Sequence, residues 1–231
     1  MRRHILILDN NNYQPCKSCY VFRRSIRARY EVYRPTEEEL PKNLDHFSHI
    51  VLTGGGGSLL DQKSAGYKRV TKLVKQAIKD EIPLLGICLG HELIITSQLG
   101  FNVIERDAEQ EVGWVHVRRV GESRLLDGLP EVFSSFASHF NHLKKLPEGF
   151  HTTATSDRCT IAGYEHETLP IFGLQFHPEK SPHSALITVL RHMRHKISKR
   201  NFIHPYSAKS NYDYRIARQI FKNFYNIKRH K

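Results

Sequence analysis

The residues 82–92, IPLLGICLGHE, decide the fold of this chain, because they join an apolar run to a helical stretch through a cysteine set between two glycines. The run over 82–87 is too short for a core helix and predicts a buried strand, while residues 91–100 predict a helix closed by Gly100. A strand that turns directly into a helix is the repeating unit of a mainly parallel α/β sheet. Such sheets form their sites at the carboxyl ends of the strands, which is where Cys88 stands.

The same alternation of short apolar runs and longer amphipathic stretches continues upstream. Strands are expected over 4–9, 30–35 and 49–57, and helices over 19–30 and 64–81. This pattern predicts an open, mainly parallel sheet that is flanked by helices.

Downstream of Gly100 the runs become shorter and alternate polar with apolar residues, which is typical of antiparallel strands. These runs cover 112–120, 152–156 and 160–167. One further core strand is expected within 169–179. The fold class that we expect is therefore α/β, with an open, mainly parallel sheet and a small antiparallel sheet inserted into it.

The excess of positive charge belongs to the C-terminal part of the chain. The net charge is +12, and residues 191–231 hold 12 of the 35 Lys and Arg but only one of the 23 acidic residues. Two amphipathic helices are expected there, over 184–200 and 211–227. We interpret 1–180 as one domain and 181–231 as a basic helical extension that completes it. No known DNA- or RNA-reading module is visible, so we do not expect nucleic acid as a partner despite the basic tail.

Composition argues against several other classes of protein. The chain has 231 residues, 39% of them hydrophobic, and no apolar run near twenty residues, so we expect no membrane span. Its start, MRRHILILDN (1–10), is predicted to be a first strand rather than a signal peptide. Four cysteines are too few for a disulfide scaffold, and a cytoplasmic location is the expectation. Cys16 and Cys19 form a C-x-x-C without two further ligands at the usual spacing, so we expect reduced thiols there and no metal.

Cys88 has the surroundings of a nucleophile. A side chain at a sharp strand-to-helix turn is exposed, lies near the helix N-terminus and has backbone N–H groups beside it that can bind an oxyanion. Gly86 and Gly90 permit close packing of the helix on the strand, and the helix dipole favours the thiolate over the thiol. The alternative is a cysteine that only fills the core.

A thiolate needs a general base, and a carboxylate that orients the base, before it can hydrolyse an acyl group. His177 and Glu179 follow the expected core strand in FGLQFHPEK (172–180), and side chains two residues apart in an extended segment point to the same side. The glycine run in LTGGGGS (52–58) can turn amide N–H groups toward a developing negative charge. Each motif alone has a structural explanation as a turn or a flexible loop, but three such motifs at strand ends predict a thiol-based hydrolase.

These residues give the chain a resemblance to the class I, or triad-type, glutamine amidotransferases. The nucleophile motif of that family is close to G-(I/V)-C-(L/F/Y)-G-(H/M)-Q, and its base motif is close to (F/Y)-G-(V/L)-Q-F-H-P-E. Here they read GICLGHE (86–92) and FGLQFHPE (172–179), and the match covers about residues 4–180 in order. The resemblance implies a flavodoxin-like sheet and hydrolysis of the glutamine side-chain amide through a thioester on Cys88.

The resemblance also implies roles for other residues. His177 would act as base and then as acid, and Glu179 would orient it. The backbone amides of Gly55 and Leu89 match the oxyanion positions. The positions expected to contact the substrate are Gly54, Gly55, Leu89 and Glu92. No cofactor is implied.

Three departures from the family pattern stand out. Glu92 replaces the usual Gln, and a carboxylate cannot donate the hydrogen bonds that an amide donates. Gly56 replaces the proline of the common G-G-P turn, which loosens the oxyanion loop. After Glu179 the family has roughly V-x-H-T and soon a final helix, whereas here KSPH (180–183) and an inserted basic helix come first.

Within the family, SSFASHFNHLKKLPEGF (134–150) looks most like the glutaminase part of GMP synthetase, although Asn141 stands where that group usually has Asp. This implies that ammonia passes to a separate ATP-pyrophosphatase synthase subunit for GMP synthesis. Two alternatives stay open. One is a γ-glutamyl amide hydrolase that acts without a synthase, which Glu92 motivates. The other is a non-catalytic triad scaffold whose basic tail binds a partner or nucleic acid.

Overall fold

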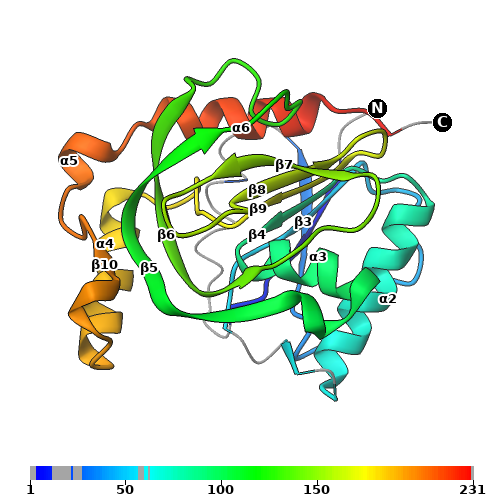
Figure 1. The fold of residues 1–231 in the computed structure, drawn as a ribbon. Coiled ribbons are helices and arrows are strands. Elements are labelled where there is room, and N and C mark those ends of the chain that lie inside the picture. The colour runs from blue at the N-terminus through cyan, green and yellow to red at the C-terminus, as the bar shows by residue number, and fades with distance from the viewer. Residues whose placement is uncertain (1–3, 12–21, 23–27, 57–59, 62, 230–231) are drawn as a thin grey trace.

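The computed structural model describes residues 4–11, 22, 28–56, 60, 61 and 63–229, and within them ten strands share one sheet (Figure 1). Its parallel half consists of β1 (His4–Leu8), β2 (Arg29–Tyr33), β3 (His49–Leu52), β4 (Leu84–Ile87) and β9 (Ile171–Leu174). These strands pair in the order β2-β1-β3-β4-β9, each parallel to the next. β3, β4 and β9 are buried along their whole length, as expected of parallel strands that are covered on both faces.

Antiparallel strands extend the same sheet beyond β9. They are β5 (Ile104–Arg119), β6 (Val132–Leu143), β7 (Phe150–Thr155) and β8 (Gly163–His166). The pairing runs from β9 through β8 and β7 to β5, which also pairs with β6. The short β10 (Phe202–Ile203) lies parallel to β5. In Figure 1 the two long strands β5 and β6 curve across the front of the sheet.

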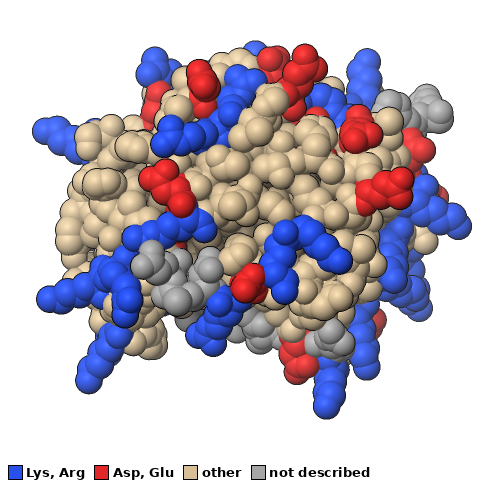
Figure 2. All heavy atoms as spheres, in the orientation of Figure 1, with Lys and Arg blue, Asp and Glu red and all other residues tan. Residues whose placement is uncertain are grey.

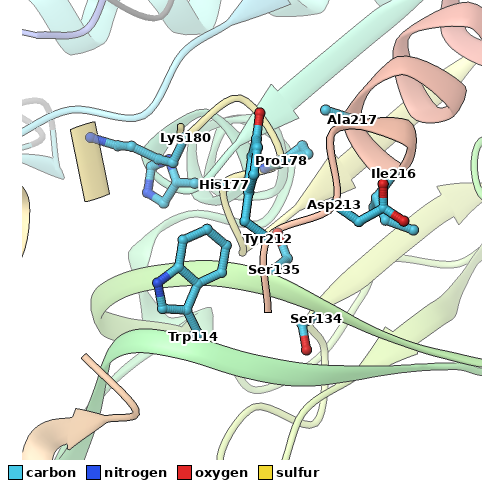
Figure 3. A pocket seen from close by; sticks show the side chains of 10 residues that line it. All are labelled: Trp114, Ser134, Ser135, His177, Pro178, Lys180, Tyr212, Asp213, Ile216 and Ala217. Atoms are coloured by element: carbon cyan, nitrogen blue, oxygen red, sulfur yellow. The ribbon is translucent and has the colours of Figure 1, made fainter. Parts of the chain in front are cut away.

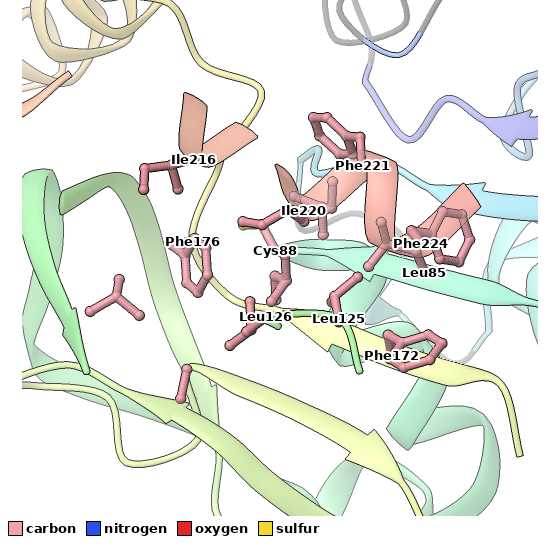
Figure 4. Close-up of a cluster of buried hydrophobic side chains, with 14 of the residues drawn as sticks. Leu85, Cys88, Leu125, Leu126, Phe172, Phe176, Ile216, Ile220, Phe221 and Phe224 are labelled. Carbon is pink, nitrogen blue, oxygen red and sulfur yellow. The ribbon is translucent and has the colours of Figure 1, made fainter. Parts of the chain in front are cut away.

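Helices cover the two faces of the parallel strands, and the alternation of side chains along β1 shows how. Leu6 and Leu8 belong to the buried cluster that includes α2 (Ala65–Lys79) and α3 (Leu89–Leu99). Ile5 and Ile7 point to the opposite face. There they join the cluster of α6 (Tyr214–Asn226), whose apolar side chains Figure 4 shows together with those of β4 and β9. The core is therefore split by the sheet into two layers.

The fold class predicted from the sequence is confirmed, with a difference in the antiparallel part. β5 and β6 are much longer than the runs expected there, and the antiparallel strands continue the parallel sheet rather than form a small sheet of their own. The expected strand 49–57 ends at Leu52, and Thr53 to Gly56 form a loop. The expected helix 19–30 lies almost entirely outside the described residues.

The C-terminal part contains two packed helices and a short one. α4 (Pro182–Arg194) and α5 (Ala208–Asn211) lie on the side of the molecule where β10 pairs with β5 (Figure 1). The helix expected over 184–200 is thus interrupted, since α4 ends at Arg194 and a single 3-10 turn follows at Lys199–Asn201. The division into 1–180 and 181–231 stays a prediction. None of the helices among the described residues has the length and apolar character needed to cross a membrane.

Candidate active site

Cys88 lies at a sharp turn between β4 and α3. Its backbone has the unusual φ of 50°, and its N–H donates to the carbonyl of Leu174 on β9 at 2.7 Å. A positive φ is costly for a residue with a side chain and persists only where the surroundings enforce it. Here the enforcement is close packing, because a Cβ on Gly86 would overlap the backbone of Gly90, and a Cβ on Gly90 would overlap that of Leu52. The two glycines that frame the cysteine are therefore required by geometry.

His177 and Glu179 follow β9 and form a buried pair. The Nδ1–H of His177 donates to Oε1 of Glu179 at 2.7 Å. The backbone N–H of His177 donates to the carbonyl of Phe136 on β6 at 2.7 Å, so the residue is held through its backbone as well as through its ring. Burial alone raises the pKa of Glu179, but the charge and hydrogen bond of His177 outweigh it, and the pKa of that carboxyl is lowered. Glu179 is thus held as a carboxylate that orients the ring.

Gly54 brings the two strand ends together. A Cβ at this position would lie 2.6 Å from Cε1 of His177 and 3.3 Å from Cβ of Cys88. Both side chains therefore converge on the same small volume beside the loop after β3. Residues from three strand ends, which are far apart in sequence, form one site at one edge of the sheet.

The thiol of Cys88 differs from the expectation in one respect. We expected the helix dipole to favour the thiolate, but burial raises the pKa of the Cys88 thiol well above its usual range, and the carboxylates of Glu92 and Glu179 add to this effect. The thiol donates weakly to the carbonyl of Ser138 on β6, with Sγ 3.7 Å from the oxygen. Because burial outweighs the dipole, the resting sulfur is a thiol and needs a base to become a nucleophile.

The loop that contains Gly54 and Gly55 is fixed to the end of β1. Asn10 Nδ2 donates to the carbonyl of Thr53 at 2.6 Å, and the Asn10 backbone N–H donates to the Thr53 hydroxyl at 3.0 Å. A Cβ on Gly55 would overlap the carbonyl group of Asn10. Leu89, the other expected oxyanion position, is the first residue of α3. Leu89 thus follows Cys88 directly in the chain and Gly55 follows Gly54, and the role of their amides as oxyanion donors stays a prediction.

Glu92, the departure from the family motif, is buried in the first turn of α3. Nε2 of Gln175 donates to its Oε1 at 3.4 Å. Burial raises the pKa of Glu92 to about 7, although His139, Gln175 and Asn141 oppose the rise. The side chain can therefore be a neutral carboxylic acid near neutral pH, and in that form it has a hydrogen to donate.

A buried polar network next to Glu92 was not predicted from the sequence. His139 Nε2 lies 2.9 Å from Oε2 of Glu111, and the Ser156 hydroxyl donates to the same carboxylate at 2.9 Å. Glu111 on β5 is the register partner of His139 on β6. The only signal in the sequence is the position of His139 within the stretch 134–150, and it does not reveal the partner.

A small pocket opens beside His177, between β6 and the start of α6 (Figure 3). Its lining includes Tyr212 and Asp213 from the C-terminal part, and the ring of Tyr212 lies edge-on to Trp114 with centroids 5.9 Å apart. The remaining lining residues are Ser134, Ser135, Pro178, Lys180, Ile216 and Ala217. The segment after residue 181 therefore borders the site that the earlier residues form.

A group of metal-ligating side chains lies elsewhere in the described residues. The ligand atoms of His4, Glu31 and His46 all lie within 4.8 Å of one another. This group is at the amino end of β1, whereas Cys88 follows the carboxyl end of β4. The ion pair between His4 Nε2 and Glu31 Oε1, at 2.8 Å, explains why two of these three side chains lie together. Cys16 and Cys19 lie outside the described residues, and Cys159 is buried.

Comparison with known proteins identifies relatives along most of the chain. Residues 11–196 match the family Glutamine amidotransferase class-I. One subunit of the GMP synthase (glutamine-hydrolyzing) of Methanopyrus kandleri is 32% identical over 181 residues, which are 76% of this chain and 88% of that protein. The GMP synthase (glutamine-hydrolyzing) of Clostridium novyi is 32% identical over 77% of this chain but only 33% of its own length.

Solved structures support the fold. A glutamine amidotransferase of Thermotoga maritima superimposes with a TM-score of 0.81 over 98% of this chain and 100% of its own, at 21% identity. One from Methylobacillus flagellatus gives a TM-score of 0.76 over 100% of this chain and 96% of its own, at 16% identity. The family match covers more than half of the chain, and the Methanopyrus relative agrees with it. The chain therefore belongs to the class-I glutamine amidotransferase family.

Proposed function

We propose that this chain is the glutaminase subunit of a two-subunit GMP synthase. It would hydrolyse the side-chain amide of glutamine and supply ammonia to a separate synthase subunit. The observation that carries the proposal is the convergence of Cys88 and the His177–Glu179 pair around Gly54. The names of the Methanopyrus and Clostridium relatives, both GMP synthases, support GMP as the product of the two-subunit enzyme. The match to 88% of the Methanopyrus protein, which is itself one subunit of its enzyme, favours a separate synthase.

The first half of the reaction forms a thioester on Cys88. Because Nδ1 of His177 is bound to Glu179, its Nε2 takes the thiol proton as the sulfur attacks the amide carbon. The negative charge on the amide oxygen is stabilised by the backbone N–H groups of Gly55 and Leu89. His177 then donates its proton to the leaving nitrogen, and ammonia departs. The Glu179 carboxylate stabilises the imidazolium that exists between these two transfers.

In the second half water replaces the thioester. His177 accepts a proton from a water molecule whose oxygen attacks the thioester carbon, and the same two amides hold the oxyanion. The C–S bond breaks, the proton returns to sulfur, and glutamate is released. Each turnover consumes one glutamine and one water, and it produces one glutamate and one ammonia.

Glutamate release from glutamine tests the proposal. We expect Cys88→Ala, assayed together with the organism's own ATP-pyrophosphatase synthase subunit, to lose at least about 10³-fold in kcat, because the nucleophile is gone. Cys159→Ala serves as the matched cysteine control. Ammonium chloride should restore nucleotide synthesis by the Cys88→Ala complex. A Cys88→Ala variant that still hydrolysed glutamine at the wild-type rate would overturn the mechanism.

A further inference from the structure

The outer face of α4 carries an apolar stripe that nothing in the described chain covers. Leu186, Leu190 and Met193 are 41%, 52% and 48% exposed, and their spacing places them on one side of the helix. The neighbouring row of α4, about 100° round the helix, is buried through Ala185 and Val189. Tyr206 adds to the stripe, since its hydroxyl lies 3.0 Å from Sδ of Met193. A helix whose apolar surface extends beyond the row that packs on its own domain is typical of an element that also packs on another protein.

Positive charge surrounds this stripe. Residues 182–201 contain five Lys and Arg and neither Asp nor Glu. Figure 2 shows blue side chains gathered at the lower left, over α4 and the segment that follows it. An apolar centre with a charged rim is the anatomy of a protein interface, and the sign of the rim calls for an acidic partner surface. A nucleic acid would need the positive charge but would leave the exposed leucines uncovered.

The inner side of α4 touches the strand that lies over Cys88. Nε2 of His192 and the Ser138 hydroxyl are 2.9 Å apart, and the His192 ring packs edge-on against Phe140 with centroids 5.2 Å apart. The carbonyl of the same Ser138 accepts the Cys88 thiol. Burial, helped by nearby cations, lowers the pKa of His192 to about 4, so this contact is a neutral hydrogen bond.

The Lys180 side chain makes a second connection between α4 and the site. Lys180 directly follows Glu179 in the chain, and its Nζ donates to the Thr188 hydroxyl on α4 at 3.0 Å. A movement of α4 would therefore be passed to two places in the site. His192 connects it to Ser138, whose carbonyl accepts the Cys88 thiol, and Lys180 connects it to the backbone next to Glu179.

We infer that the stripe of Leu186, Leu190 and Met193 is the docking surface for the acidic and apolar face of the separate synthase subunit, and that His192 couples docking to Cys88. This inference rests on the proposed function and adds the surface and the connection. Docking shifts α4, the His192 hydrogen bond moves Ser138, and the thiol is released from the Ser138 carbonyl toward His177. His192 is a positioning residue in this scheme, because it acts through Ser138.

Binding of the synthase subunit tests the surface. We expect Leu190→Glu to weaken the dissociation constant at least tenfold in isothermal titration, while glutamine hydrolysis by the isolated chain stays as in the wild type. Val120→Glu, a change at a valine that is 41% exposed after β5, is the matched control and should bind normally. Unchanged binding of Leu190→Glu, or an equal loss with Val120→Glu, would overturn the docking surface.

A second pair of variants tests the coupling. We expect His192→Ala to bind the synthase within twofold of the wild type but to lose most of the increase in kcat that the synthase produces, with KM for glutamine little changed. His192→Gln keeps a donor for Ser138 and should restore part of the increase. Full stimulation of His192→Ala would overturn the coupling role.

The outcomes separate this inference from the proposed function. If the wild-type complex hydrolyses glutamine and Leu190→Glu binds as well as the wild type, the docking surface is wrong and the function stands. If the wild type neither binds the synthase nor hydrolyses glutamine, both are wrong. Binding of RNA that Leu190→Glu leaves intact, in a chain that ignores the synthase, would replace the protein partner with nucleic acid.

Discussion

Glu92 holds a carboxyl group where burial makes ionisation expensive. Its pKa is raised to about 7, and the neutral form has one donor in place of the two that an amide offers. At neutral pH the residue is therefore divided between an acid, which resembles the usual glutamine of the family, and a carboxylate, which does not. The charged form also raises the pKa of Cys88. One substitution in the motif thus changes both the donors at position 92 and the pKa of the Cys88 thiol.

Glu92→Gln should make the stability of the fold less dependent on pH. A carboxyl whose pKa is raised in the folded state contributes stability below its unfolded value, near 4.5, and loses it as pH rises toward about 7. Between pH 5 and pH 8 we expect the free energy of unfolding of Glu92→Gln to gain about 2–3 kcal/mol relative to the wild type. Urea denaturation at the two pH values measures this. The exposed Glu148→Gln should show no gain, and an equal response of both variants would contradict the account.

Glu179→Gln should separate catalysis from binding. The amide keeps the shape of the side chain, but it carries no charge to balance the imidazolium, and its N–H can donate to Nδ1 of His177 and favour the wrong tautomer. We therefore expect kcat to fall by about 10²–10⁴-fold with KM for glutamine within a few-fold. Steady-state glutaminase kinetics with the synthase subunit present measure both constants. Near-wild-type kcat would mean that Glu179 does not orient the base.

At the scale of elements, the site depends on how closely the strand ends approach one another. The two adjacent glycines 54 and 55 permit this approach in different ways. A Cβ on Gly54 would meet the side chains of His177 and Cys88, whereas a Cβ on Gly55 would overlap backbone of Asn10. The His177 ring can rotate away from its clash at the expense of the hydrogen bond to Glu179, but backbone held by neighbouring strands cannot move away. The same added methyl group should therefore have two different consequences.

Gly54→Ala should remove activity with little loss of stability, and Gly55→Ala should remove both. For Gly54→Ala we expect a fall in kcat of about 10²-fold or more, since the His177 ring must move from its near-attack position. For Gly55→Ala we expect overpacking to cost about 1–3 kcal/mol of unfolding free energy as well. Thermal unfolding and glutaminase assays on both variants decide the matter. Wild-type activity in Gly54→Ala would show that the ring is not confined as described.

The elements also show which parts of the structure the sequence can predict. The strands β1, β3, β4 and β9 could be predicted from their continuous apolar runs. The location of the candidate site could be predicted as well, because open α/β sheets bind their ligands at the carboxyl ends of the parallel strands. The length of β5 was not predictable, because charged residues over 105–111 interrupt its alternation where the register with β6 shifts. The Glu111–His139 contact depends on that register, so it appears only when the two strands are paired. The place of Cys88 at the strand-to-helix turn was predictable, but its burial and raised pKa were not.

At the scale of the whole molecule, the two long helices of the basic C-terminal part, α4 and α6, differ in how much of their apolar surface is buried. α4 holds Arg191 and Arg194 and α6 holds Arg215, Arg218 and Lys222, but the apolar residues of the two helices differ in burial. Ile216, Ile220 and Phe224 of α6 are buried against the sheet (Figure 4), whereas the stripe on α4 faces outward. The positive charges on α6 therefore lie on the solvent side of a core helix, while those on α4 surround an uncovered apolar surface.

Phe224→Ala tests whether α6 is part of the core that holds the site. Its ring is fully buried and contacts those of Phe172, on the strand before His177, and His49, at the start of β3, with centroids 6.2 and 5.1 Å apart. Emptying this position should cost about 3–5 kcal/mol of unfolding free energy. Leu190→Ala on α4 should cost little, because that side chain is half exposed. Chemical denaturation of both variants measures the difference. If α6 were only an appendage, Phe224→Ala would leave the main unfolding transition unchanged. A shift of that single transition would instead mean that β3, β9 and α6 unfold together. The residues before and after 181 would then form one cooperative folding unit.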